Sequence, residues 1–213
     1  MSRNAPTILA LLLLVATATA FAVTQRLKLE PSPISQTHVA KVFSPVCECA
    51  THVADIDFSL RRADRLRVAI RIDGRELTIA NGEFARGLVH VRWNGRDAGG
   101  NVVRDGIYYA VVHMQRAQRT IDVPNPIRVD TQRPTITLVR VRQDGAKTLF
   151  YYRISERGHA LLFVNGRRRV YTYSTNRRGR LPWYGRPAAR TRLVLEAEDL
   201  AGNRSPPVRI HGF

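Results

Sequence analysis

Residues 91–112 have the sequence VRWNGRDAGGNVVRDGIYYAVV, and this stretch indicates the fold more clearly than any other. A β-branched strand ends at Trp93, a loop rich in Gly, Asn and Asp follows, and the turn Asp105-Gly106 begins an aromatic and β-branched strand. Gly, Asn and Asp tolerate the positive φ angles that tight turns require. Strands joined in this way are typical of a β-sandwich, and they favour a building block over a catalyst.

The same alternation of apolar and polar residues extends through the first half of the chain. Ile56, Phe58 and Leu60 alternate with polar residues, and residues 66–72 alternate in the same way before Asp73-Gly74. A period of two indicates half-buried strands, and Asp-Gly is a strong hairpin signal. Residues 107–114 are apolar on both sides and predict a central strand. No stretch after residue 30 has a sustained helical period, so we expect an all-β protein.

The strand pattern then repeats after a proline-rich segment at residues 123–134. Phe150, Tyr152 and Ile154 correspond to the first alternating strand, Asn165-Gly166 to Asp73-Gly74, and Trp183 to Trp93. Self-similarity near 90 residues indicates tandem domains, because solenoid repeats are much shorter. We therefore predict two tandem Ig-like β-sandwich domains, 38–129 and 130–213, with a fibronectin-III-like topology as the alternative.

The N-terminus carries a targeting segment. Residues 7–23 contain no charged residue, Arg3 precedes them, and Arg26 follows. This length is marginal for a membrane span, and small residues at positions 18–22 also suit signal-peptide cleavage. Residues 1–26 are thus a signal peptide or a membrane anchor, and residues 27–37 a Pro/Ser tether. We expect an exported protein anchored in the membrane through residues 8–23 with extracellular domains. The alternative is a cleaved, secreted protein.

The charge is strongly positive, with 34 Lys and Arg against 17 Asp and Glu. A GC-rich genome would favour Arg codons, while a functional surface of guanidinium groups would bind phosphate or carboxylate polymers. The densest runs contain Arg167, Arg168, Arg169, Arg177, Arg178 and Arg180. These residues are either solvated strand ends or a polyanion patch. The candidate partners are envelope proteins or an anionic cell-wall polymer. We expect no nucleic-acid partner, because the chain is exported and has no recognisable nucleic-acid module.

The only cysteines, Cys47 and Cys49, are separated by one residue. In an oxidising compartment free thiols seldom persist, so a local disulfide competes with an intermolecular bond and with free or metal-bound thiols. No metal site is expected, because four Cys or His ligands are needed and His52 is the only near neighbour.

No catalytic motif is present, and we predict neither an enzyme nor a cofactor. The six histidines are scattered, and no nucleophile elbow or phosphate-binding loop occurs. Trp93 and Trp183 are interpreted as core or rim residues, with carbohydrate stacking as the alternative. The acidic residues Glu196, Glu198 and Asp199 are interpreted as solvated charge.

Four motifs along the chain carry a family resemblance. Phe43-Ser44-Pro45 and the W-N-G-R-D-A-G-G-N-V-V-R-D-G-I-Y stretch at 93–108 resemble the immunoglobulin-like domain of flagellar hook-capping proteins. Asp130–Pro134 and Ala197–Asn203 resemble bacterial Ig-like domains that occur in tandem on cell surfaces. The resemblance covers about residues 40–211, and Val46–Cys49 stands where the hook-capping family often has an Asn-Gly-Asp-Gly turn. It implies a secreted β-sandwich module rather than the hook-capping role itself, because the assembly region has no counterpart here.

Overall fold

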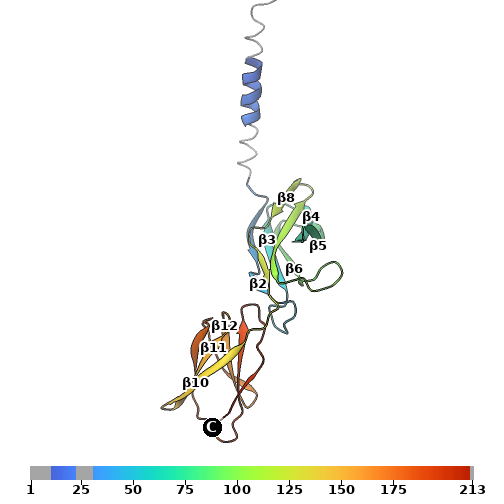
Figure 1. The fold of residues 1–213 in the computed structure, drawn as a ribbon. Coiled ribbons are helices and arrows are strands. Elements are labelled where there is room, and N and C mark those ends of the chain that lie inside the picture. Colours follow the sequence, from blue (N-terminus) through green and yellow to red (C-terminus); the bar gives the residue numbers. More distant parts are fainter. Residues whose placement is uncertain (1–10, 23–30, 212–213) are drawn as a thin grey trace, which may run out of the picture.

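The computed structural model describes residues 11–22 and 31–211. Residues 11–22 are helical and their side chains are exposed. Within the described residues, no helix combines the length and the apolar character that a membrane crossing needs. The anchor was predicted at residues 8–23, and of these only residues 8–10 and 23 lie outside the described residues. From residue 31 onward the described chain consists of strands, turns and loops, and Figure 1 shows two β bodies in succession.

The first body, here called the first sandwich, contains nine strands in two sheets. One sheet has the order β1-β3-β6 and the other has β2-β9-β7-β4-β5, with β8 also paired to β7. The strands are β1 (Ile34–Val39), β2 (Val42–Phe43), β3 (Ala54–Leu60), β4 (Asp64–Ile72), β5 (Arg75–Phe84), β6 (Gly87–Trp93), β7 (Gly106–Met114), β8 (Arg119–Asp122) and β9 (Ile127–Val129). β7 is a central strand, because it pairs with β4 on one side and with β8 and β9 on the other.

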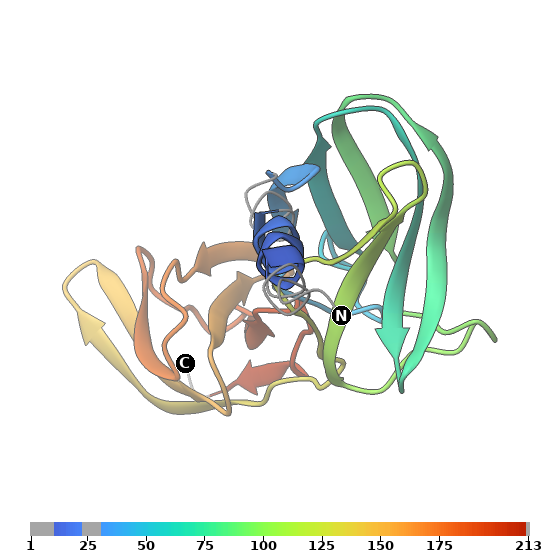
Figure 2. The same ribbon diagram turned by 90° about the horizontal axis from the view of Figure 1, so that it is seen from above.

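The second body, the second sandwich, contains seven strands in two sheets. The orders are β10-β11-β14 and β13-β12-β15-β16. The strands are β10 (Ile136–Asp144), β11 (Lys147–Ile154), β12 (Gly158–Val164), β13 (Arg167–Tyr171), β14 (Arg178–Trp183), β15 (Leu193–Asp199) and β16 (Val208–Ile210). Viewed from above in Figure 2, the two sandwiches are separate bodies.

Each sandwich encloses its own hydrophobic core. One cluster of buried residues comes entirely from residues 34–129 and the other from residues 136–210. Inward-facing residues alternate along β3 (Ile56, Phe58) and along β11 (Phe150, Tyr152), as the period of two predicted. Burial of these apolar side chains is the main force that closes each pair of sheets.

In both sandwiches the fourth main strand, which is β5 in the first and β13 in the second, belongs to the same sheet as the third main strand. β5 pairs with β4, and β13 pairs with β12, so each joins the second sheet. In a constant-type Ig domain the fourth strand lies beside the fifth in the first sheet. The order therefore fits the alternative fibronectin-III-like topology better than the constant-type Ig arrangement.

The sequence features that repeat lie at equivalent places in this order. Asp73-Gly74 forms the β4–β5 turn and Asn165-Gly166 the β12–β13 turn, with positive φ at all four residues. Trp93 ends β6 and Trp183 ends β14. The same local chemistry thus forms the same hairpin in both sandwiches.

The 93–108 motif fixes one end of the first sandwich. Trp93 is 1% exposed, packs edge-to-face between Phe43 and Tyr108, and donates a hydrogen bond from Nε1 to the carbonyl of Arg96. The Tyr108 hydroxyl donates to the carbonyl of Arg104 at 2.7 Å. A tyrosine at the start of this strand that bonds back to the backbone is a feature of Ig-like sandwiches. Trp93 is a core residue, and a carbohydrate cannot stack on it.

The tether and the first sandwich overlap. Strand β1 begins at Ile34, which is buried and lies opposite Leu60. The expected tether at 27–37 therefore ends before residue 34, because Ile34 and Val39 reach the core and hold the intervening residues in the sheet. Residues 27–30 lie outside the described part of the chain.

Candidate anion-binding surface

The six arginines of the predicted patch divide between two sheets. Arg167, Arg168 and Arg169 lie on β13 at the edge of the four-stranded sheet, and all three are exposed. Arg178 and Arg180 lie on β14 in the three-stranded sheet, and Arg177 precedes them. The six therefore lie on two different sheets, whose edge strands β13 and β14 contact each other.

The β14 arginines belong to a larger surface that the sequence pattern did not reveal. Strand pairing aligns Arg178 with Arg153, and aligns Arg180 with Tyr151 and Arg140. Arg142 lies on the same face, opposite Leu149. We call the outer surface of β10-β11-β14 the arginine face, defined by Arg140, Arg142, Arg153, Arg178 and Arg180.

A β-bulge places two of these arginines. The register between β10 and β11 shifts between Leu138 and Arg140, so Val139 has no partner and is 63% exposed. Strict alternation from the inward-facing Leu138 would turn Arg140 toward the core. The extra residue instead directs Val141 inward and both Arg140 and Arg142 outward.

The long arginine stems cover apolar and aromatic surface. Leu149 faces outward but is only 4% exposed, between Arg142 on one side and Pro182 on the other. The Arg140 guanidinium lies 4.2 Å from the centre of the Tyr151 ring. Such packing leaves the charged ends at the surface while the stems shield the sheet.

None of the five guanidinium groups has a carboxylate within ion-pair distance in the described residues. The equivalent sheet of the first sandwich is different. There Arg92 lies opposite Asp55, with Nε 3.1 Å from Oδ1, and His90 lies opposite Asp57. The positive side chains of the β1-β3-β6 face are paired with carboxylates of the same face. The arginine face instead presents an uncompensated positive charge. A general bias toward arginine does not account for that contrast between equivalent positions.

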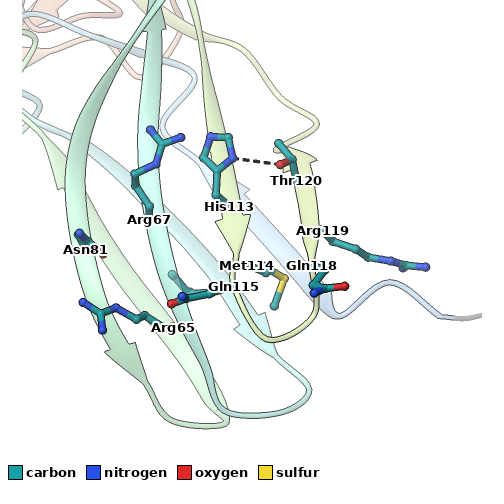
Figure 3. Close-up of a pocket in the computed structure, with 10 residues that line it drawn as sticks. Arg65, Arg67, Asn81, His113, Met114, Gln115, Gln118, Arg119 and Thr120 are labelled. Atoms are coloured by element: carbon teal, nitrogen blue, oxygen red, sulfur yellow. Dashed lines mark hydrogen bonds between the residues drawn. The ribbon is translucent and has the colours of Figure 1, made fainter.

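A cavity of the first sandwich shows the paired arrangement in detail. It has a volume of about 330 Å³, and Figure 3 shows Arg67 and His113 close together on the same face of the sheet. Arg67 Nη2 and His113 Nε2 bond Glu76 at 2.9 and 2.7 Å, and His113 Nδ1 bonds Thr120. Burial by itself would raise the pKa of Glu76, but the hydrogen bonds from His113 and Arg67 outweigh it and lower that pKa. Arg67 and His113 therefore both pair with the same carboxylate, Glu76.

The cysteine loop belongs to the junction between the sandwiches. Cys47 and Cys49 are joined by a disulfide with a Cα–Cα distance of 5.2 Å. Both sulfurs lie within 4 Å of the Ala201 carbonyl oxygen, and Thr51 Oγ1 donates a hydrogen bond to that oxygen at 2.8 Å. Ala201 is in the turn between β15 and β16, so the loop packs directly on the second sandwich.

The segment between the sandwiches is fastened to both. Thr131 donates from its backbone N and its hydroxyl to Asp105 Oδ1, at 2.8 and 2.9 Å. Asn203 Nδ2 donates to the carbonyl of Asp130 at 2.9 Å and to Asp199 Oδ2 at 2.8 Å. Both Asp105 and Asn203 lie within the motifs that carry the family resemblance, so these motif residues act at the junction.

Asp199 is buried rather than solvated, which corrects the interpretation of the acidic cluster. It is 4% exposed, and its Oδ1 accepts the backbone N–H groups of Ala201 and Asn203. Burial raises its pKa, the bonds from Asn203 and Ala201 oppose the rise, and the charge of Asp130 adds to it. Burial, followed by the charges of Asp199 and Asp130, also raises the pKa of Glu156. No group of three or more His, Cys, Asp or Glu suited to a metal ion occurs in the part of the chain that the structure describes.

Comparisons with known proteins give only distant structural likeness. No family model matches the chain, and no curated protein sequence matches it. The chain is similar in structure to the fibronectin(III)-like modules of CbhA from Clostridium thermocellum, at 14% identity and a TM-score of 0.45, covering 83% of this chain and 90% of that one. It is also similar to a 1.5-MDa bacterial ice-binding adhesin, at 19% identity and a TM-score of 0.36, covering 83% and 63%. Likeness at this level implies nothing about binding or activity, so the functional proposals depend on the contacts within the chain.

Proposed function

We propose that this protein is a non-catalytic, exported cell-envelope protein whose two Ig-like β-sandwich domains, 38–129 and 130–213, form one fixed spacer and interaction surface. The observation that carries this proposal is the junction. Two side-chain contacts cross it, Thr51 to Ala201 and Thr131 to Asp105. Asn203 additionally holds the backbone of Asp130 at the start of the second domain. We also propose that the first domain is of the hook-capping Ig-like type, and this assignment depends on the resemblance of its 93–108 sequence motif.

A glycine substitution tests the fixed junction. Gly202 has φ +92°, and a Cβ there would lie 2.4 Å from Cys49 Sγ and 2.6 Å from Thr51 Oγ1. Gly202→Ala should therefore separate the two sandwiches locally without entering either core. Spin labels at Leu88→Cys and Tyr184→Cys, both highly exposed, measure the distance distribution between sandwiches by double electron–electron resonance.

The expected result is one narrow distribution in the parent protein and a broader or shifted one in Gly202→Ala. Gly166→Ala is the matched control, because Gly166 also has a positive φ but a Cβ there meets nothing within 4 Å. A broad distribution in the parent protein would contradict the fixed spacer.

Export and membrane attachment are a separate part of the proposal. We propose that residues 1–26 stay attached as a membrane anchor, with a cleaved signal peptide as the alternative. Fractionation combined with N-terminal sequencing distinguishes the two. The anchor predicts an intact N-terminus in the membrane fraction, whereas a mature N-terminus at Phe21 or Val23 in the medium contradicts it.

The arginine face supports a second function, binding of an anionic cell-wall polymer. Residues 130–213 hold 17 Lys and Arg against 6 Asp and Glu, so most of the net charge lies on the second sandwich. A sheet surface with five guanidinium groups and no acidic partner in the described residues attracts polyanions, and each fork can bind a phosphate or carboxylate with two hydrogen bonds. The absence of carboxylate partners for these five guanidinium groups in the described residues is the observation that favours polymer binding.

Two triple variants with the same change in charge test this function. Arg140, Arg153 and Arg178 are replaced by Gln in one, and Arg167, Arg168 and Arg169 in the other. Affinity for poly(glycerol phosphate) should fall about tenfold or more in the first, with a smaller slope of log affinity against log salt. The second should lose much less. Equal losses in both variants would assign the binding to net charge and overturn the arginine face as the site.

A further inference from the structure

One cavity of the arginine face differs from the rest of that surface because it collects donors from three strands. It has a volume of about 360 Å³ and lies where β10 begins, β11 ends and β14 begins. Its polar lining consists of Thr135, Thr137, Arg153, Ser155, Arg177 and Arg178. No Asp or Glu lines it.

The two arginines of adjacent strands lie directly opposite each other. Arg153 on β11 is the register partner of Arg178 on β14, and both are exposed. Like charges directly opposite in a sheet are destabilising. No carboxylate within ion-pair distance relieves this pair in the described residues, so the sheet maintains an unfavourable arrangement that a bound anion would relieve.

The third arginine is held in place by the backbone. Arg177 donates to the carbonyl of Ser155 from Nε, at 3.0 Å, and also from Nη2. The Arg177 carbonyl in turn accepts the N–H of Ile154. Glu156 is the acidic group that interacts electrostatically with Arg177, but no ion pair joins them. Arg177 is therefore positioned at the cavity before any ligand binds.

Hydroxyl groups complete the lining. Ser155 Oγ accepts the backbone N–H of Thr135 at 3.0 Å, which leaves its hydroxyl hydrogen free to donate to a ligand. The side-chain hydroxyls of Thr135 and Thr137 make no hydrogen bond within the described chain. Three guanidinium groups and three hydroxyls thus surround one space.

We infer that this cavity binds one tetrahedral oxyanion, a phosphoryl group within a phosphodiester-linked polymer. The inference rests on the proposed polyanion function and specifies its ligand. A planar carboxylate offers two oxygens, which one guanidinium fork can satisfy. A phosphoryl group offers oxygens in several directions, and donors that come from three strands match that arrangement.

The remaining arginine face continues from this cavity. Arg180 follows Arg178 on the same side of β14, about 7 Å further along the strand. Arg180 lies in one row with Tyr151 and Arg140. The next phosphoryl groups of the polymer would contact this row, so the polymer is expected to run along the strands.

The test uses the full-length chain in nonionic detergent and inorganic phosphate as the probe. ³¹P NMR line broadening and calorimetry measure binding at constant ionic strength, with acetate as the planar competitor. We expect phosphate to bind at least about fivefold more tightly than acetate, because only phosphate has oxygens that can reach donors on all three strands. Arg153→Gln or Arg178→Gln should weaken phosphate binding about tenfold, whereas Arg167→Gln and Arg169→Gln, with the same change in charge, should not change it.

Stability provides an independent measurement. Because the Arg153–Arg178 pair is repulsive when empty, Arg178→Gln should raise the melting temperature of the phosphate-free protein and reduce the further increase that phosphate produces. An unchanged melting temperature without phosphate would contradict the repulsive pair.

The outcomes separate this inference from the function on which it rests. If poly(glycerol phosphate) binds through the arginine face but phosphate and acetate bind equally, the cavity assignment is overturned and the polyanion function stands. If phosphate binds in the cavity but no polymer binds, the polyanion function is overturned. Binding to phosphatidylglycerol vesicles but not to the polymer would assign the phosphoryl group to a lipid and overturn the polymer as its source.

Discussion

At Gly95 the backbone has a φ of 71°, and a Cβ would lie 2.8 Å from the Pro45 Cβ. Gly95→Ala should therefore destabilise the first sandwich through two effects. The left-handed conformation costs about 1 kcal/mol, and the collision of the new Cβ with Pro45 costs about 1–3 kcal/mol. Gly100 is the matched control, because its φ is +80° but a Cβ there meets nothing within 4 Å. Urea unfolding of both variants measures the difference, and equal losses would show that Pro45 moves away without cost.

Two carboxyl groups should respond to acid with opposite sign. The folded-state pKa of Glu76 is lowered from 4.5, so its contribution to stability is complete above pH 4.5 and is lost as pH falls through the folded pKa. The pKa of Glu156 is raised from 4.5, so its charged form is unfavourable at neutral pH and protonation relieves it as pH falls through the raised pKa.

Replacing each residue by Gln makes this difference measurable. At pH 7, Glu76→Gln should lower the free energy of unfolding and Glu156→Gln should raise it. Both differences from the parent protein should shrink as the pH falls to about 3.5, which urea unfolding at a series of pH values can follow. Differences of the same sign at pH 7 would refute the assignment of these two environments.

At the scale of elements, the bulge at Val139 determines which side chains β10 presents. Deleting Val139 should convert the bulge to regular pairing and leave Arg140 and Arg142 outside, with a stability change within about 1 kcal/mol. Deleting Val141 removes the same kind of residue but forces an arginine inward in either register, which costs several kcal/mol. Thermal unfolding and polymer binding distinguish the two deletions, and equal effects would mean that the bulge does not set the register.

At the scale of the whole molecule, the disulfide loop couples the sandwiches more than it stabilises either core. The disulfide closes only a very short loop, so its entropic effect on the unfolded chain is small. Replacing both cysteines by Ser should leave the two cores folded, with melting temperatures changed by no more than about 2 °C. The distribution between the Leu88 and Tyr184 labels should broaden, because the loop 46–52 loses its packing on Ala201. Global unfolding of the first sandwich in this variant would contradict a role confined to the junction.

The sequence by itself determined what depends on neighbours along the chain. Alternation identified the buried faces of β3, β4 and β11, the turns Asp73-Gly74 and Asn165-Gly166 marked equivalent hairpins, and Trp93 was correctly interpreted as a core residue. These predictions succeed because side-chain direction in a strand has a period of two and because positive φ favours a few residue types.

Only the tertiary structure decided which distant residues meet. Arg140, Arg142 and Arg153 join Arg178 and Arg180 through strand pairing and a bulge, whereas the denser run Arg167–Arg169 lies in the other sheet. The missed signal was weak: arginines at alternate positions, 140 and 142 and again 178 and 180, in segments for which no strand bounds were predicted. Asp199 was interpreted from the sequence as solvated but is buried, because the turn that follows it folds back and donates hydrogen bonds to its carboxylate. Charge density along the chain is local, but a binding surface depends on register between strands, and that register is set by the packing of the whole sandwich.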